Sequence, residues 1–520
     1  SVMARNELLS KVWAYEYGVI WNGMEGVWRF TGDSRYFDYI KNSVDTFVSE
    51  DGSSVRGYKR EAYNVDLVNN GKQLLMLYAE TKEPKYKRAA DMFRDQFREH
   101  PRTSEGGFWH KQIYPWQMWL DGIYMASPFL ARYGAMFDEP ELFDDVVNQV
   151  RLIYKHTVDP DTGLCYHAWD EKREQFWANP ETGWSPHFWG RAMGWFMAAM
   201  VDILDYLPQD HEGRKDIIQI FNDCTEALFK VQDPEKLCWY QVLDQGDRPG
   251  NYLEASASCM YVYAFAKAIR KGYLPDSYKD QVKKTYAALI EQFIEETKDG
   301  LVNVNKIVQV SGLGGEGKRD GSFAYYMSEP IISNDGKGVG AFIGASLEVE
   351  ELMKERSRKM KTRIGVIGTG WRAGFFLRAA KMLPQQFEVC GVVYHSEAGK
   401  ERAGAWGVPL FASPEQLVQE TKPDYVVVSV SRKSGVARQI TAQLAEMGVP
   451  VLMETPPADS LEDLTEFYKQ CGQAKIQVAE QYQFQPMIAA RLAVAASGQI
   501  GQVYQTQFHL PNGYHSISVH

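Results

Sequence analysis

Apolar residues along the first two thirds of the chain recur at steps of three and four residues, the spacing of amphipathic helices. The strongest run, WQMWLDGIYMASPFLARYGAMF at 116–137, places a single carboxylate, Asp121, where the helical pattern begins. Polar turns such as TGDSR and TKEPK separate the apolar runs. The pattern predicts helices at 6–31, 34–49, 67–80, 84–99, 121–136, 140–157, 190–206, 213–231, 253–271, 276–296 and 337–354.

Short turns join these helices two by two, as in antiparallel helical hairpins. Eleven predicted helices and a truncated one at Ser1 make six pairs. Six hairpins predict an all-α (α/α)6 barrel over residues 1–355. In such a barrel the first helix of each hairpin belongs to one ring, so the starts of alternate helices gather at one end.

Beyond a basic linker at 354–363, short apolar strands alternate with helix-length segments. The expected strands are RIGVIG, EVCGVVY, DYVVVSV, VPVLME and KIQVAE. Strands alternating with helices predict an α/β Rossmann-type, doubly wound parallel sheet over residues 361–480. Residues 481–520 are too few for another domain of ordinary size, so we expect them to begin an incomplete C-terminal substrate domain.

Charge and cysteine spacing exclude several classes of partner. The net charge of −10 and the lack of a Lys/Arg stripe argue against nucleic acid and leave small molecules as the expected substrates. Six cysteines are scattered without the spacing of a metal site or a disulfide framework, and no run of about 18 apolar residues predicts a membrane span. Free thiols favour the cytoplasm, although a chain that begins at Ser1 leaves room for a removed signal peptide.

Chemically distinctive residues fall at the expected starts of alternate helices and in the loops before them. They are Asp66, His110, Lys111, Trp119, Asp121, His167, Trp184, His187, Arg191, Trp195, Glu254, Ser256, Ser258 and the loop 320–330. Carboxylates, basic groups and indole rings at one rim are what a sugar pocket needs. An apolar lining would disfavour the ionised form of Asp121, as a proton donor requires, whereas the helix N-terminus would favour that form.

Each of these residues also has an interpretation without a catalytic or binding role. Asp121 and Asp66 could be ordinary N-cap or first-turn acids. Arg191 could pair with an acid of the core, and Trp195, four residues later, could simply pack there. His187 could stabilise its own turn.

Six blocks lie in order between Arg56 and Pro330: RGYKREAYNVDLVNNGKQLL, GGFWHK, YPWQMWLDGIYMASPF, LCYHAWDE, SPHFWGRAMGWF and DGSFAYYMSEP. Together they resemble the family 105 glycoside hydrolases, the unsaturated rhamnogalacturonyl hydrolases. The resemblance implies a barrel that removes a 4,5-unsaturated galacturonic acid from rhamnose at the end of a pectin fragment. It implies that Asp121 is the general acid/base and Asp66 the second acid. It also implies substrate-binding roles for Trp119, His167, Arg191 and Trp195.

Such a substrate needs one acid where ordinary glycosidases use two. Its C4=C5 enol ether can be protonated at C4 and attacked by water at C5, after which the hemiketal opens and expels the aglycone. Asp121 can serve both proton transfers, and no cofactor is expected. Arg191, His167 and Lys111 are candidates to bind the C6 carboxylate, and His110 is expected at the same rim.

Gly368, Gly370 and Ala373 fit G-x-G-x-x-A directly after the first expected strand, the context of a dinucleotide-binding turn. With KPDYVVVSV and VPVLMETPPA, this turn resembles the Gfo/Idh/MocA oxidoreductases, which implies NAD or NADP as cofactor. Residues 394–396 lack the acid that would favour NAD. The family's Glu-Lys-Pro is Glu-Thr-Pro at 454–456, and Thr cannot supply an ammonium group. We therefore expect cofactor binding without hydride transfer, with a sheet that binds nothing as the alternative.

The sequence thus leaves three functions in competition. The first is hydrolysis of unsaturated uronyl oligosaccharides by the helical part. The second is an NAD(P)-dependent sugar oxidoreductase with the helical part as an accessory, against which Thr455 and the short C-terminal region count. The third is a noncatalytic glycan-binding barrel, against which the presence of both Asp66 and Asp121 counts.

Overall fold

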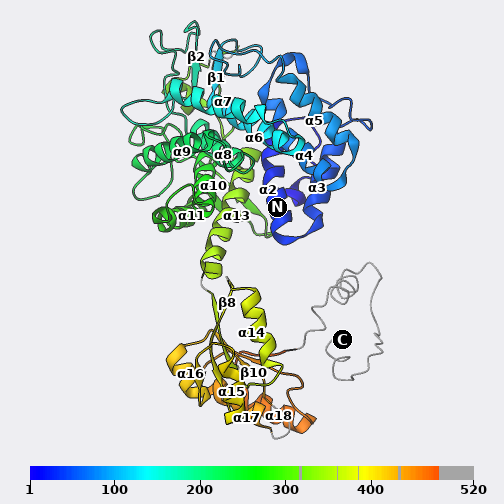
Figure 1. The fold of residues 1–520 in the computed structure, drawn as a ribbon. Coiled ribbons are helices and arrows are strands. Elements are labelled where there is room, and N and C mark those ends of the chain that lie inside the picture. Colours follow the sequence, from blue (N-terminus) through cyan, green and yellow to red (C-terminus); the bar gives the residue numbers. More distant parts are fainter. Residues whose placement is uncertain (316–318, 360, 385, 431–434, 473, 480–520) are drawn as a thin grey trace. The chain divides into compact units, whose positions relative to one another are not determined.

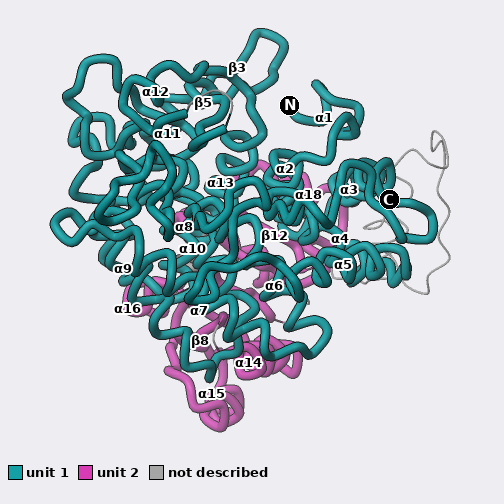
Figure 2. Tube along the Cα trace, turned by 90° about the horizontal axis from the view of Figure 1, so that it is seen from above, with its two compact units in different colours: residues 1–353 teal, residues 354–520 magenta. Residues whose placement is uncertain are grey.

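The computed structural model divides the chain into two compact units, residues 1–353 and 354–520 (Figures 1 and 2). The described residues are 1–315, 319–359, 361–384, 386–430, 435–472 and 474–479. Residues 481–520, expected to begin a further domain, lie outside them. None of the described helices is long and apolar enough to cross a membrane.

The contacts between helices arrange the first unit, whose helices are labelled in Figure 1, as an inner and an outer ring. The inner ring consists of α2 (Tyr15–Thr31), α4 (Gly71–Thr81), α6 (Leu120–Phe137), α8 (Gly190–Ile203), α10 (Ala255–Lys271) and α13 (Gly336–Lys359). The outer helices are α3 (Ser34–Asp45), α5 (Pro84–Gln96), α7 (Glu141–Thr157), α9 (Gly213–Lys230) and α11 (Lys279–Phe293). This arrangement confirms the predicted (α/α)6 barrel.

Local sequence signals end each inner helix and start the outer one that follows. Helix α2 ends at Gly32, whose φ of 72° suits glycine, and the Asp33 side chain then caps α3 by accepting from the Arg35 backbone N–H. Helix α4 ends at Lys82, and Pro84 opens α5, where its missing N–H costs nothing. These tight turns hold neighbouring helices antiparallel.

Helix α13 closes the inner ring by packing against α2 and α10 through glycines. A Cβ atom on Gly340 would lie 2.3 Å from the Val19 carbonyl oxygen, and one on Gly344 would lie 3.0 Å from the Tyr263 ring. Gly23 of α2 meets Ile343 in the same way, at 3.0 Å. The remaining inner helices pack side by side in chain order, from α2 to α10.

The structure corrects the expected start of the first long helix of this unit. The helix expected at 6–31 begins at Tyr15, and the only earlier helix described is α1 (Val2–Arg5). Leu9 and Trp13 are buried, and the Trp13 indole donates to the Leu67 carbonyl oxygen at 2.9 Å, so this segment packs on the barrel as irregular chain.

No strands were expected among the helices, but three short antiparallel pairs occur there. They are β1 (Gln117–Trp119) with β2 (Ala168–Asp170), β3 (Ile294–Glu296) with β4 (Val302–Val304), and β5 (Ile307–Val308) with β6 (Ile331–Ile332). Each strand has two or three residues, which is too short to show an alternating pattern. The six-residue helix α12 (Phe323–Ser328) precedes β6.

The second unit contains a parallel six-stranded sheet in the order β12-β11-β10-β7-β8-β9. The strands are β7 (Thr362–Ile367), β8 (Phe387–Val393), β9 (Leu410–Phe411), β10 (Tyr425–Val428), β11 (Val451–Met453) and β12 (Ile476–Val478). The helices are α14 (Ala373–Met382), α15 (Glu397–Gly404), α16 (Pro414–Thr421), α17 (Val436–Glu446) and α18 (Leu461–Cys471). Val426 and Val428 belong to one apolar cluster and Val427 to another, so both faces are covered, as a doubly wound sheet requires.

Gly340→Ala should lower the melting temperature of the helical unit, because the new methyl group meets a backbone oxygen that cannot move aside. Overpacking of this kind costs about 1–3 kcal/mol. Gly26→Ala on the same interface is the matched control, since its nearest neighbour is the flexible tip of Leu347. Thermal unfolding followed by circular dichroism measures both, and equal melting temperatures for the two variants would contradict this account of ring closure.

Candidate active site

Strand pairing brings His167 next to Asp121. Trp119 ends β1 and pairs with Ala168 of β2, so the residue before β2 reaches the start of α6. The Leu120 backbone N–H donates to the His167 carbonyl oxygen at 3.1 Å. The Asp121 carboxylate, in the first turn of α6, therefore faces the imidazole of a residue 46 positions later.

The contact between Asp121 and His167 leaves one polar atom of each side chain available to a ligand. Asp121 Oδ2 lies 3.3 Å from His167 Nε2, and neither atom has a hydrogen bond within the described residues. The Asp121 side chain keeps 13% of its surface exposed, whereas His167 is fully buried. The other ring nitrogen of His167, Nδ1, lies 2.9 Å from the Tyr326 hydroxyl, which fixes the orientation of the ring. Tyr326 lies in the last of the six blocks, but no pattern in the sequence marks it as a site residue.

Asp66 lies in a different electrostatic environment. It sits in a short 3-10 helix (Val65–Val68), with its Oδ2 2.7 Å from Lys111 Nζ and its Oδ1 3.3 Å from His110 Nε2. Burial raises the pKa of Asp66, but the charges and hydrogen bonds of Lys111 and His110 outweigh burial and hold the pKa well below its ordinary value. Burial alone would lower the pKa of Lys111, but the Asp66 carboxylate raises it. Asp66 is therefore ionised at neutral pH and suited to orient groups rather than to donate a proton.

A stack of rings connects the two acids. His110 stacks on Trp119 with centroids 4.6 Å apart, and Tyr114 covers the indole at 5.0 Å. His167 meets the same indole edge-on at 5.3 Å. Trp119 thus contacts the histidine beside Asp66 and the histidine beside Asp121, so it holds their separation fixed.

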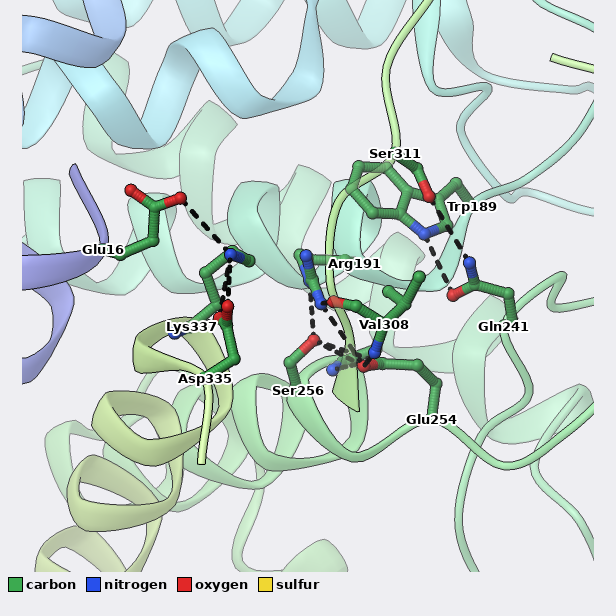
Figure 3. A network of polar contacts seen from close by, with 11 residues as sticks. Glu16, Trp189, Arg191, Gln241, Glu254, Ser256, Val308, Ser311, Asp335 and Lys337 are labelled. Atoms are coloured by element: carbon green, nitrogen blue, oxygen red, sulfur yellow. Dashed lines mark hydrogen bonds and ion pairs between the residues drawn. The ribbon is translucent and has the colours of Figure 1, made fainter. Parts of the chain in front are cut away.

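Arg191 lies in a buried polar network (Figure 3). Its Nε donates to Ser256 Oγ at 2.7 Å, and its Nη2 donates to the Val308 carbonyl oxygen and lies 3.5 Å from Glu254 Oε1. The Arg191 side chain is 1% exposed. This is the pairing with a core acid that the sequence left open. Nη1 has no hydrogen bond within the described residues, so a contact with substrate through that nitrogen stays a prediction.

Trp195 is buried one turn after Arg191. Its ring packs against Tyr124 at 4.6 Å and Tyr15 at 6.1 Å. Tyr15 itself was not predicted as a site residue. Burial raises its pKa well above the ordinary value, the carboxylates of Glu16, Asp66 and Asp121 raise it further, and Arg191 opposes them. Tyr15 is therefore close to the groups at the starts of α4, α6 and α8.

The predicted convergence of helix starts is therefore present in the structure. A family model described as Glycosyl Hydrolase Family 88 matches residues 3–353, more than half of the chain. The chain belongs to this family. It is an enzyme of the glycoside hydrolase class, and the described residues of the structure contain no group of three or more His, Cys, Asp or Glu side chains that could hold a metal ion.

Known proteins similar to the family 88 unit confirm the resemblance carried by the six blocks. A solved family 105 glycoside hydrolase from C. acetobutylicum ATCC 824 is 52% identical, with a TM-score of 0.67, over 68% of this chain and 97% of that one. A possible family 105 member from Salmonella enterica is 25% identical, with a TM-score of 0.55, over 67% of this chain and 86% of that one. Unsaturated rhamnogalacturonyl hydrolase YesR of Bacillus subtilis is 28% identical over 319 residues, which are 60% of this chain and 86% of YesR.

A second family model, described as Oxidoreductase family, NAD-binding Rossmann fold, matches residues 362–482. Its glycine turn lies between β7 and α14. Gly368 has φ 114°, and a Cβ there would lie 2.0 Å from the Ser429 carbonyl oxygen, so only glycine fits. Gly370 faces open space and borders a cavity of about 580 Å³ that Thr455 also lines. Arg372 Nη1 lies 2.5 Å from Glu454 Oε2 at the same cavity.

Lys111→Met should destabilise the family 88 unit at pH 7 by about 1–3 kcal/mol, because it leaves the buried Asp66 charge without its main partner. A carboxylate whose pKa is depressed by folding contributes stability above its unfolded pKa, near 4, and loses it as pH falls through the folded pKa. The difference between wild type and variant should therefore be constant above about pH 5 and shrink below about pH 4.

Thermal unfolding from pH 3 to pH 8 measures this difference. Lys111→Arg is the control, since it keeps a cation beside Asp66 and should lose much less stability. A gap between wild type and Lys111→Met that widens on acidification would contradict the ion pair.

Proposed function

We propose that the family 88 unit removes a 4,5-unsaturated galacturonic acid from the non-reducing end of rhamnogalacturonan-derived oligosaccharides by hydrating the C4=C5 double bond. The observation that carries this proposal is the unequal state of the two acids. Asp66 is held ionised by Lys111 and His110, whereas the only ion-pair partner of Asp121 among the described residues is His167. One acid is thus available for proton transfer, which is the number that hydration of an enol ether requires.

In the proposed reaction Asp121 donates its proton to C4, and the positive charge that develops at C5 is quenched by water. The Asp121 carboxylate then takes a proton from that water, which restores the acid. The hemiketal at C5 opens to a ketone and leaves a hemiacetal at C1. Collapse of this hemiacetal to an aldehyde releases the aglycone as an alcohol. An ordinary glycosidase would need a second carboxylate for direct displacement at the anomeric carbon.

His167, Lys111 and Arg191 were expected to bind the C6 carboxylate of the substrate. Lys111 is already paired with Asp66, and Arg191 uses two of its three guanidinium nitrogens within the protein. Arg191 Nη1 and His167 Nε2 are among the buried nitrogens without a hydrogen bond in the described part of the chain, so of the three candidates we assign the carboxylate to these two. The similarity to YesR, an unsaturated rhamnogalacturonyl hydrolase, supports a rhamnose-linked substrate.

Asp121→Asn should fold normally and lose turnover by several orders of magnitude, because an amide can neither donate the proton to C4 nor accept one from water. The assay follows the loss of ultraviolet absorbance of the conjugated enol ether in a lyase-generated pectin disaccharide. Asp138→Asn, the same change at the C-terminal end of α6, is the matched control and should retain full activity. Near-normal turnover in folded Asp121→Asn would overturn the mechanism.

For the second unit we infer binding of NAD(H) or NADP(H) at the carboxyl end of β7, without hydride transfer. The family match and the open space at Gly370 support binding. The phosphates would lie against Gly370 and the start of α14, while Thr455 offers no ammonium group for proton transfer.

Gly370→Val should abolish nicotinamide dinucleotide binding in calorimetric titration, because its side chain would enter the space that the pyrophosphate needs. Gly404→Val in α15 is the control, since a side chain there meets nothing within 4 Å. Sugar-dependent reduction of the nicotinamide by the wild-type chain would show that Thr455 does not prevent hydride transfer.

A further inference from the structure

The barrel contains a cavity whose lining includes neither candidate catalytic acid. It has a volume of about 520 Å³ and is lined by residues from all six inner helices. Most of these residues lie in the middle and second half of their helices, such as Glu25, Arg132, Asp202, Lys267 and Glu348. The candidate catalytic acids lie at the other end, at the helix starts.

Trp195 and Tyr124 form part of the inner wall of this cavity. Their rings pack at 4.6 Å, and the second neighbour of Trp195 is Tyr15, whose surroundings include both candidate catalytic acids. Trp195, which the sequence predicted at the substrate site, therefore stands between that site and the cavity. Its ring offers the cavity an apolar face of the kind that packs against sugars.

Lys72, the second residue of α4, lines the cavity and forms no ion pair within the described residues. The residue is 5% exposed, and its Nζ has no hydrogen bond or carboxylate partner within the described residues. The amine lies 4.0 Å from the centroid of the Tyr124 ring. Burial lowers its pKa to about 7, the Asp202 and Glu25 carboxylates oppose this, and Arg132 and Lys267 add to it. A buried amine in this state is stabilised by any anion that reaches it.

Most of the other charged residues around the cavity form ion pairs with one another. Arg132 and Arg29 pair with Glu25 at 3.2 and 3.0 Å. Lys267 pairs with Asp202 at 2.6 Å, and Arg270 pairs with Glu348 at 2.7 Å. These pairs form a polar wall whose outer lone pairs and N–H groups can still bond hydroxyl groups, whereas Lys72 Nζ has no hydrogen bond within the described residues.

We propose that this cavity binds a small hydroxylated carboxylate, of the size of one sugar acid, whose carboxylate pairs with the Lys72 ammonium group. The volume lies within the range of small-molecule sites, about 300–1,000 Å³. The charged pairs of the wall bond the hydroxyl groups, and the ring of Trp195 packs on the carbon skeleton. The site is separate from the catalytic acids, so its occupant is bound rather than hydrolysed.

Calorimetric titration with sodium galacturonate tests the proposal. Lys72→Met is the key variant, because methionine fills similar space without a buried charge, so its melting temperature should equal or exceed that of wild type. Its affinity for galacturonate at this site should fall at least tenfold. Lys111→Met, which alters a lysine of the candidate active site, is the matched control and should keep this binding.

Two further ligands test the chemistry of the occupant. Galactose, which lacks the carboxylate, and acetate, which lacks the hydroxyl groups, should each bind at least tenfold more weakly than galacturonate. Equal binding of acetate would overturn the sugar-acid assignment. Galacturonate binding that persists undiminished in Lys72→Met would place the ligand outside this cavity and overturn the proposal.

Discussion

The barrel depends on the close approach of α13 to α2 and α10. Glycine at 340 brings the backbone of α13 against the Val19 carbonyl oxygen, and glycine at 344 brings it against the Tyr263 ring. Larger residues there would hold α13 away from both neighbours and leave the inner ring open. Because the ring closes, the starts of its helices meet at one end, and the cavity lined by all six helices forms towards the other.

Closing the ring also buries charged side chains. Some of these side chains are paired within the protein, and others are left with unpaired polar atoms. Arg191 bonds Ser256 and Val308 and pairs with Glu254 (Figure 3). Asp66 pairs with Lys111 and His110. These buried pairs hold the side chains of the candidate site in fixed positions. Asp121 Oδ2 and Lys72 Nζ are among the buried polar atoms that have no hydrogen bond within the described residues. Asp121 lies at the proposed reaction centre and Lys72 lines the barrel cavity, and we expect a ligand at each.

In the second unit the close backbone approach that requires glycine occurs at a turn rather than between helices. Gly368 lets β7 turn sharply beneath Ser429, which frees Gly370 and the start of α14 to face the cavity. The strand order, with β7 between β8 and β10, puts this turn at the switch point of the sheet, where ligands of such folds bind. This placement of the turn supports the proposed dinucleotide site, although Thr455 stands where the resembled family has lysine.

The sequence by itself determined the features that depend on local pattern. Three- and four-residue periodicity identified the inner and outer helices, a change of period identified the sheet, and Asp121 and the glycine turn stood out at the boundaries of elements. The sequence pattern did not predict the start of α2. Residues 6–14 have the composition of a helix, but the contact of Trp13 with Leu67 holds them on the barrel as irregular chain.

Only the tertiary structure decided which partner each polar side chain takes. Tyr326 reaches His167 across 159 residues, and Arg191 reaches Val308 across 117, so no local pattern could indicate either contact. The same holds for Lys72, which reads in the sequence as an ordinary charged residue near a helix start and becomes an unpaired cation when six helices close around it. Helix formation follows from neighbours in the chain, whereas the pairing of buried charges follows from ring closure, which brings distant segments together.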